Sequence, residues 1–430
     1  MWQELSLSLL AIISFLQAGL VADYYLLRGK PSWSNLPIYF GLGIGLVGFC
    51  QIIAGLVGIR LSQTSVLSAS LLVFTPYLLE RKLRLFIASA SKITLPHSFL
   101  ILLPFFFIIG SLAFAHIIWG YDAYAFWLSK ARAFWVDGLI TRENLYAFWP
   151  WDQPILWPMQ ATWFYHILGR ADGFWVQFIP LSVLVMLIFW FAVLVFKEKK
   201  KWRHLWLFLL LLTPFLWGQL AFAEYAGNAD LLVSFFLLLA VSSIIGRKTI
   251  YAAIFLGLAF YSKNDALPAL AGFIFFLPLV GKNGKTRFPA SWWLAVFFLG
   301  SHLAWKYYFG LSNRYLGQNL IAIARERPIL PYIWYTLHAF REEFRQINHW
   351  GAGWWLIIFT LVLKWRVFLK DYLLRLGLIL VGAQFLGYVW AYYVTVENPA
   401  SQISTSIFRL ALQIYPALVF LAYKAAAKLS

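Results

Sequence analysis

The chain has 430 residues, of which 62% are hydrophobic and 12% are charged, and its net charge is +18. Soluble domains carry about a quarter charged residues, so this composition excludes an ordinary soluble domain. The single cysteine, Cys50, excludes an internal disulfide and a cysteine metal cluster.

Apolar runs long enough to cross a bilayer recur along the whole chain. A helix of roughly 20 residues crosses about 30 Å of hydrocarbon, which predicts an all-α polytopic membrane protein with about 13 transmembrane helices. The predicted spans are residues 5–27, 37–59, 64–79, 98–119, 173–196, 204–219, 229–245, 249–262, 266–281, 290–309, 351–369, 372–395 and 408–427.

Basic residues are distributed unevenly between the ends of these spans. Nearly all of the net charge of +18 falls at alternate ends, including the run KEKKKWR of Lys197–Arg203, whereas acids and bases balance at the other ends. The positive-inside rule places the basic ends in the cytoplasm. We therefore expect a plasma-membrane protein with its N-terminus outside and its C-terminus inside. The charge then reflects topology, and we expect no nucleic-acid partner.

Two long external loops are expected, at about residues 120–172 and 310–350. The first contains two helix-like segments that end in glycine, YDAYAFWLSKARAFWVDG and DQPILWPMQATWFYHILG. Glycine is a natural helix C-cap, and Asp152 followed by Pro154 is typical of an N-cap and a first helical turn. Both segments are too short and too polar to span, so we expect in-plane helices whose aromatic faces lie in the membrane interface.

Asp122 follows an apolar run directly and opens the first of these segments. A carboxylate at headgroup depth can meet a lipid-borne substrate and act as a general base. It can equally serve as a helix N-cap that benefits from the helix dipole. If the helix is regular, Asp122, Phe126 and Lys130 share one face.

Acids and bases also gather at two shorter external turns. Glu224 and Asp230 flank Tyr225 in AEYAGNAD. Near the bilayer such acids are costly unless they are paired or hydrated, and the simpler interpretation is that they are solvated loop residues. Lys263 and Asp265 lie in YSKND at the outer end of a span. Lys263 can contact a lipid phosphate, anchor the helix in the interface, or pair with Asp265.

The late external loop contains HAFREEFRQINHWG, which predicts an amphipathic helix. Arg341 and Arg345 fall on one face because they are four residues apart, and arginines near headgroups favour phosphate. Surface pairing with the neighbouring glutamates is the alternative. No metalloprotease, phosphate-loop or serine-triad motif accompanies them.

Four segments occur in an order that resembles a known family: WGYDAYAFWLSKARAF, WDQPILWPMQATWFYHILG, FAEYAGNADLLVSFFLLLA and LGLAFYSKNDALPALAGFIFF. This order is similar to that of the GT-C superfamily of integral-membrane glycosyltransferases, in the branch of protein O-mannosyltransferases and aminoarabinose transferases. The resemblance covers residues 95–310 and, more loosely, 340–430. It implies a catalytic module at 93–309, a loop over the donor at 310–350 and C-terminal helices at 351–430. The helices at 1–92 have no counterpart in the family, and we expect them to be accessory.

The resemblance also implies a reaction and its residues. A sugar would pass, with inversion, from a polyprenyl-phosphate donor to a hydroxyl of a glycan, lipid or protein at the outer face. Asp122 would activate the acceptor, Glu224 or Asp230 would be the second acid, and Lys263 would lie near the donor phosphate. Asp265 departs from the family, because many relatives carry Gly or Glu there. We assign donor phosphate or lipid contacts also to Lys130, Arg132, Arg341 and Arg345, and acceptor or sugar contacts to Tyr121, Asp152, Tyr225, Asp265 and His349.

Two questions stay open at this point. Some relatives use a divalent metal ion, and the external carboxylates can bind one, so the sequence does not decide on a cofactor. The alternative function is a transporter or flippase of a glycolipid or small solute. That function predicts inverted repeats and charges at the bilayer midplane. The sequence shows no repeat, and its ionisable residues lie at helix ends on one side, which favours the enzyme.

Overall fold

A computed structural model describes residues 1–62, 102–118, 120–148, 150–198, 202–221, 225, 227–278, 289–312, 325–395 and 398–428. Within these residues the regular structure is entirely helical, as predicted. Also within them, six stretches are long and apolar enough to cross a membrane: Trp2–Leu26, Trp33–Leu56, Trp175–Phe196, Arg203–Ala221, Tyr372–Val394 and Pro399–Ala427. The predicted span 64–79 lies outside the described residues, so the count of about 13 stays a prediction.

Several predicted spans are shorter or less regular than expected. Five apolar helical stretches are shorter than a full crossing: Leu102–Ala113, Asp230–Ile245, Thr249–Ser262, Asn264–Phe276 and Gly353–Leu363. The predicted span 204–219 consists of α11 (Arg203–Leu211) and α12 (Pro214–Ala221). The break falls at Pro214, whose ring cannot donate a backbone hydrogen bond. The predicted span 351–369 likewise consists of α20 (Gly353–Leu363) and α21 (Trp365–Lys370).

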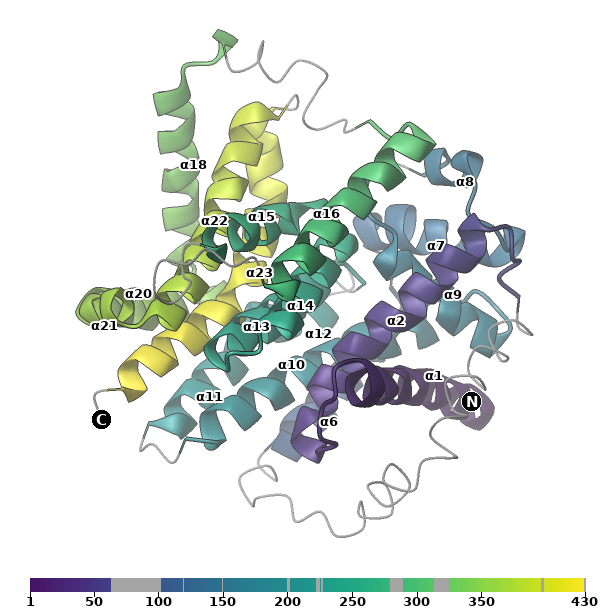
Figure 1. Cartoon of the computed structure of the whole chain (residues 1–430), viewed down its shortest axis with the longest axis horizontal. Helices are drawn as coiled ribbons and strands as arrows, with labels where there is room; N and C mark the ends of the chain where they lie inside the picture. The colour runs from purple at the N-terminus through teal and green to yellow at the C-terminus, as the bar shows by residue number, and fades with distance from the viewer. Residues whose placement is uncertain are drawn as a thin grey trace. The chain divides into compact units, whose positions relative to one another are not determined.

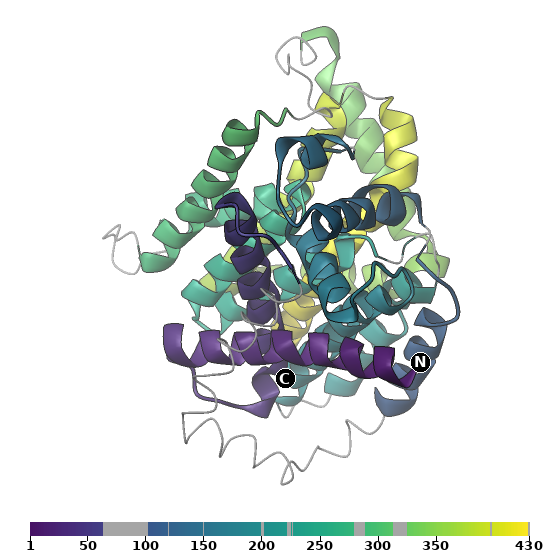
Figure 2. The ribbon, with the colours of Figure 1, turned by 90° about the vertical axis from the view of Figure 1, so that its right-hand side faces the viewer.

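One compact unit comprises Met1–Trp149, Ile155–Trp190 and Trp217–Asn228. It begins with α1 (Trp2–Val21), the purple helix that carries the N mark in Figure 2, and α2 (Leu36–Leu56), which packs against it. Glycine permits this close approach. A Cβ atom on Gly19 would lie 1.6 Å from the carbonyl oxygen of Tyr39, and one on Gly43 would lie 1.7 Å from that of Phe15. Small residues are typical of close contacts between membrane helices.

The centre of this unit is α9 (Leu156–Leu168), which ends at Gly169 in the left-handed conformation, as predicted. It packs against α1, α2 and α7 (Ser129–Asp137), and all its residues from Leu156 to Ile167 are buried. Gln160 Nε2 donates to the carbonyl of Ile44 at 2.9 Å, and Trp163 Nε1 donates to Ser14 Oγ at 3.0 Å. The aromatic side chains of α9 therefore contact protein, which corrects the expectation that they face the membrane interface.

The other compact unit comprises Pro150–Pro154, Phe191–Leu216 and Ala229–Ser430. Its core is α13 (Asp230–Ile245), which is buried from Asp230 to Ile244 and packs against α14 (Thr249–Ser262) and α23 (Pro399–Ala427) (Figure 1). The short α15 (Leu267–Phe276) packs against α22 (Tyr372–Val394), where Pro268 lies against Gly387. The remaining long helices are α16 (Ala290–Phe309) and α18 (Ile329–Phe344).

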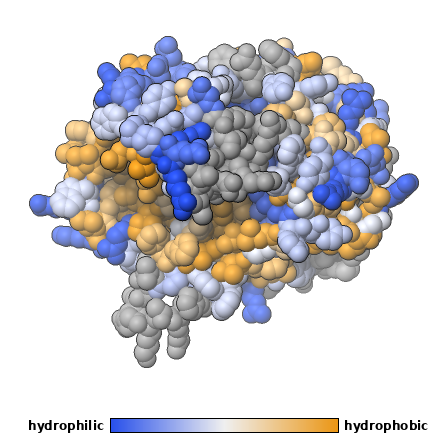
Figure 3. Space-filling model, turned by 90° about the horizontal axis from the view of Figure 1, so that it is seen from above, coloured by the Kyte–Doolittle hydropathy of each residue, from blue (hydrophilic) through white to orange (hydrophobic). Residues whose placement is uncertain are grey.

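Large apolar side chains remain exposed on helices of both units. Phe107, Phe297 and Phe359 are each more than half exposed. Figure 3 shows broad hydrophobic areas between polar patches on one face of the molecule. Soluble monomers rarely expose such areas, whereas a bilayer covers them. The surface therefore agrees with the composition in indicating an integral membrane protein.

Candidate functional site

Lys263, at the C-terminal end of α14, lies between two carboxylates. Its Nζ is 2.8 Å from Asp230 Oδ1 and 2.7 Å from Asp265 Oδ2. Asp230 is the first residue of α13, and Gln413 of α23 donates to the same Oδ1 atom at 2.6 Å. Tyr388 of α22 donates to Gln413 Oε1 at 2.7 Å. These five residues, Asp230, Lys263, Asp265, Tyr388 and Gln413, are called the Lys263 cluster below.

The two carboxylates of the Lys263 cluster differ in exposure. Asp230 is 2% exposed and Asp265 is 30% exposed, while Lys263 itself is 14% exposed. Burial alone would lower the pKa of Lys263, but Asp230 and Asp265 outweigh it and raise that pKa above its ordinary value. Lys263 is therefore a fixed ammonium at neutral pH. Its buried side is held by Asp230, and its more accessible side is held by Asp265.

The turn that carries Lys263 is fastened to α22 by Gln384. Gln384 Oε1 accepts a hydrogen bond from the backbone N–H of Ala269 at 3.0 Å, in the first turn of α15. Gln384 Nε2 donates to the backbone carbonyl of Asp265. The first N–H groups of a helix have no partner within the helix, so this side chain acts as a cap supplied from another helix. Gln384 thereby fixes the backbone of Asp265 relative to the first turn of α15.

Asp152 reaches the same turn from a segment distant in sequence. Its Oδ2 accepts from Asn264 Nδ2 at 3.1 Å and lies 3.6 Å from Nζ of Lys306 on α16. Gln153 Oε1 accepts from the backbone N–H of Asn264 at 3.2 Å. The prediction that Asp152 is a helix N-cap is wrong, because α9 begins at Leu156 and Ile155 is its N-cap. Asp152 is 1% exposed, and its Oδ2 makes long-range contacts instead.

The arrangement has a definite chemical capacity. It fixes the positive charge of Lys263 beside the partly accessible carboxylate of Asp265. A further carboxylate, that of Asp152, contacts Asn264 of the same turn. A phosphate group is a suitable ligand for such an ammonium. The described residues contain no group of three or more His, Cys, Asp or Glu side chains placed to hold a metal ion. Asp230 and Asp265 share an ammonium, which occupies the position between them.

Of the other predicted acids, Asp122 belongs to the unit that contains α9, and Glu224 lies outside the described residues. Asp122 is half-buried and makes no capping hydrogen bond to the helix that follows. That helix, η4 (Ala123–Leu128), is a π-helix. The prediction that Asp122, Phe126 and Lys130 share one face required a regular α-helix, and this requirement is not met. Single-turn π-helices often mark functional positions.

The remaining candidates of that unit differ in exposure. Tyr121 is 75% exposed and its ring meets the edge of Phe126, with 5.4 Å between ring centroids. Arg132 is exposed, whereas Lys130 is 1% exposed. Tyr225 is half-buried, and its carbonyl accepts from the backbone N–H of Asn228. Their roles in binding stay predictions.

Three further candidates, Arg341, Arg345 and His349, lie near the C-terminal end of α18. Their partners are the neighbouring Glu342 and Glu343 and not residues of the Lys263 cluster. Arg341 and Arg345 pair with Glu342, and both arginines line one groove, as their spacing predicts. His349 Nδ1 lies 2.7 Å from Glu343 Oε1, and Trp350 Nε1 donates to the same oxygen at 2.9 Å.

Sequence reasoning missed the polar side chains that complete the site. Gln384, Tyr388 and Gln413 lie inside predicted spans, and Gln384 and Gln413 are fully buried. A glutamine within an apolar run is itself a signal, because a polar group in hydrocarbon requires a partner. Lys306 at the end of its span gave the same kind of signal.

We compared the chain with protein-family models, curated proteins and solved structures, and none of them matches it.

Proposed function

We propose that this protein is a membrane glycosyltransferase that transfers a sugar from a polyprenyl-phosphate donor to an acceptor hydroxyl at the outer face of the membrane. The observation that carries the proposal is the ammonium of Lys263, fixed between Asp230 and Asp265 at the ends of apolar helices. Charged groups inside membrane proteins are costly and are usually functional. The order of the four sequence segments supports the same function. The proposal includes about 13 spans, an external N-terminus and a cytoplasmic C-terminus, which rest on the apolar runs and on the distribution of basic residues.

The proposed reaction is a single displacement at the anomeric carbon. Asp122 takes the proton of the acceptor hydroxyl as general base. The acceptor oxygen bonds to the anomeric carbon while the bond from that carbon to the phosphate oxygen breaks. The phosphate leaves with the electron pair, so the sugar configuration inverts and the products are the glycosylated acceptor and polyprenyl phosphate. Lys263 stabilises the negative charge that grows on the leaving phosphate.

Within this proposal the two carboxylates beside Lys263 have different tasks. Asp230 is buried and accepts from both Lys263 and Gln413, so it holds the ammonium in place. Asp265 is more exposed, so the donor phosphate replaces it as the partner of Lys263 when the donor binds. Lys306 and Asp152 fix the other side of the turn and position a sugar hydroxyl.

The experiment is sugar transfer by the purified chain in nanodiscs that contain a radiolabelled polyprenyl-phosphate sugar. Lys263→Gln should lower transfer by at least about a hundredfold, because it removes charge stabilisation of the leaving group. Lys263→Arg keeps the charge and should retain more activity. Lys248→Gln is the matched control, since Lys248 is exposed at the opposite end of α14.

A second assay separates the transferase from a transporter. The wild-type chain is placed in sealed liposomes with the labelled donor in one leaflet. Movement of intact donor to the other leaflet without cleavage of the sugar bond would replace the transferase proposal with a flippase. Normal transfer by Lys263→Gln would remove Lys263 from the mechanism.

A further inference from the structure

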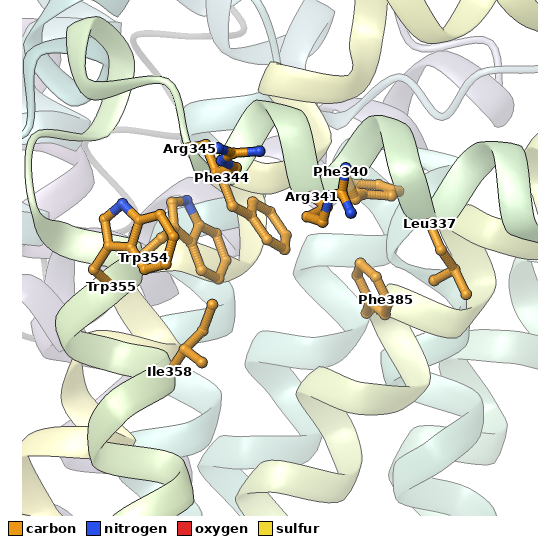
Figure 4. A pocket seen from close by; sticks show the side chains of 9 residues that line it. All are labelled: Leu337, Phe340, Arg341, Phe344, Arg345, Trp354, Trp355, Ile358 and Phe385. Atoms are coloured by element: carbon orange, nitrogen blue, oxygen red, sulfur yellow. The ribbon is translucent and has the colours of Figure 1, made fainter.

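A groove of about 410 Å³ lies between α18, α20 and α22. Its walls are almost entirely apolar, and its two charged lining residues are Arg341 and Arg345. The lining residues are Leu337, Phe340, Arg341, Phe344, Arg345, Trp354, Trp355, Ile358 and Phe385. In Figure 4 the two arginines lie toward the upper part of the groove and Ile358 lies below them. The groove is therefore amphiphilic, with its charge at one end.

The aromatic wall of the groove is preformed. The rings of Phe344 and Trp354 are stacked with 3.9 Å between their centroids, and Phe340 meets Phe385 at 4.9 Å. Phe340 and Trp354 are buried, and α18 and α20 each also pack against α23. These side chains need little ordering when a ligand enters the groove, so the entropic cost of binding is small.

The rim of the groove is exposed and apolar. Trp355 is 54% exposed and Ile358 is 43% exposed, and along the same α20 helix Phe359 and Val362 are also exposed. In a membrane protein such a surface faces lipid, and tryptophan and arginine prefer the level of the headgroups. The amphiphile that is always present at this surface is a bilayer lipid.

The charge at the end of the groove favours an anion. Arg341 and Arg345 share a single acid, Glu342, which pairs with Arg341 at 2.7 Å and with Arg345 at 3.3 Å. Arg341 Nη2 also donates to Nε2 of His338 at 2.9 Å. Two guanidinium groups against one carboxylate leave an excess of positive charge, and the guanidinium fork binds phosphate well.

We propose that this groove binds an anionic phospholipid of the bilayer, with one acyl chain between α18, α20 and α22 and the phosphate on Arg341 and Arg345. This assigns the two arginines to a bilayer lipid and not to the sugar donor, and it does not depend on the transferase proposal.

The groove is coupled to the Lys263 cluster through α22. Phe385 lines the groove, and the preceding residue, Gln384, holds the turn of Asp265. Adjacent residues of a helix point in different directions. The same part of α22 therefore lines the groove through Phe385 and supports the backbone of Asp265 through Gln384. A lipid in the groove is expected to stabilise this part of α22.

The test is native mass spectrometry of the purified full chain after incubation with defined lipids. Phosphatidylglycerol and phosphatidylcholine of equal chain length are compared, because both carry a phosphate but only the first has a net negative charge. We expect the wild type to retain phosphatidylglycerol about tenfold more than phosphatidylcholine. The double variant Arg341→Gln/Arg345→Gln should remove this preference. Ile358→Trp should reduce retention of both lipids, because it fills the groove.

The control is Arg366→Gln, which removes an exposed arginine of α21 outside the groove and should leave the preference intact. Equal retention of the two lipids by the wild type would overturn the proposal, and so would an unchanged preference in the double variant. Displacement of phosphatidylglycerol by an equal amount of polyprenyl phosphate would return the groove to the donor. If the protein retained inorganic phosphate but neither lipid, and Ile358→Trp had no effect, the groove would be a site for small anions and not for lipids.

Discussion

Lys263 and Gln413 donate hydrogen bonds to one and the same oxygen, Oδ1 of Asp230, at 2.8 and 2.6 Å. They come from α14 and α23, so one carboxylate at the start of α13 joins three helices. The arrangement explains why an acid is present at the buried end of an apolar helix. Removal of this single charge should loosen both contacts together.

We expect Asp230→Asn to lower the free energy of unfolding by about 3–5 kcal/mol, because it leaves Lys263, which is only 14% exposed, with the more exposed of its two partners. Asp265→Asn is the matched variant, and its cost should be at most about 1 kcal/mol since Lys263 keeps Asp230. Unfolding of the detergent-solubilised protein, followed by tryptophan fluorescence, measures both. Equal losses for the two variants would contradict the buried role of Asp230.

Some features of the fold and the site could be predicted because their signals are local. Gly138 and Gly169 end their helices in the left-handed conformation, as a glycine after an amphipathic segment indicates. The pairing of Lys263 with Asp265 was one of three interpretations of YSKND, and it follows from two charges within one turn. Apolar length likewise located most of the helices.

Other features could not be predicted, because a competing long-range contact decides them. Asp152 has the local context of an N-cap, but its carboxylate contacts Asn264 and Lys306 more than 100 residues away. Gln413 appears as an isolated polar residue in an apolar run, and its partner Asp230 is far from it in sequence. A single sequence gives no information on which distant partner a buried polar group selects.

The close contact of α1 with α2 gives a second prediction. A methyl group on Gly43 would lie 1.7 Å from the backbone oxygen of Phe15, and a backbone atom cannot move aside cheaply. We expect Gly43→Ala to cost at least about 2–3 kcal/mol of stability. Gly300→Ala, at an open position of α16, is the control and should be neutral or stabilising by about 0.5–1 kcal/mol. Thermal unfolding of both variants in the same detergent measures the difference.

His166 of α9 gives a third prediction, on pH dependence. Its Nε2 is buried without a partner, and burial lowers the pKa of His166 to about 4. An unfolded histidine takes up its proton near pH 6.5, so the folded chain binds fewer protons between these values. The contribution of His166 to the free energy of unfolding is therefore fully present above about pH 6.5. It falls as the pH drops toward 4 and changes no further below that.

Between pH 7 and pH 4 we expect His166 to lower the free energy of unfolding by about 1–3 kcal/mol. The side chain lines a polar hollow, which keeps this loss small. His166→Gln removes the titrating group and should flatten this part of the profile. The difference between the wild-type and variant unfolding curves from pH 7 to pH 4 isolates the contribution of His166 from those of other histidines. Parallel curves would show that His166 titrates normally in the folded chain.

The last prediction concerns Asp122, for which the sequence left two interpretations. Its side chain makes no capping hydrogen bond to η4, and asparagine caps a helix about as well as aspartate. Asp122→Asn should therefore change stability by less than about 1 kcal/mol. As general base, Asp122 is instead needed to accept the proton of the acceptor hydroxyl, a function that asparagine lacks. Such catalysis typically contributes about 10²–10⁴-fold, so transfer should fall at least about a hundredfold.

Sugar transfer from a polyprenyl-phosphate donor in nanodiscs separates these interpretations. Glu143→Gln is the control, because Glu143 is an exposed acid of α8 (Arg142–Tyr146) in the same stretch of chain. The control should retain normal transfer, and donor binding by Asp122→Asn should match that of the wild type, since only proton transfer is lost. If Asp122→Asn keeps transfer within about threefold of the wild type, Asp122 is not the base. The base would then have to be sought at Asp152 or Glu224, beginning with Asp152 because its carboxylate contacts the turn that carries Lys263.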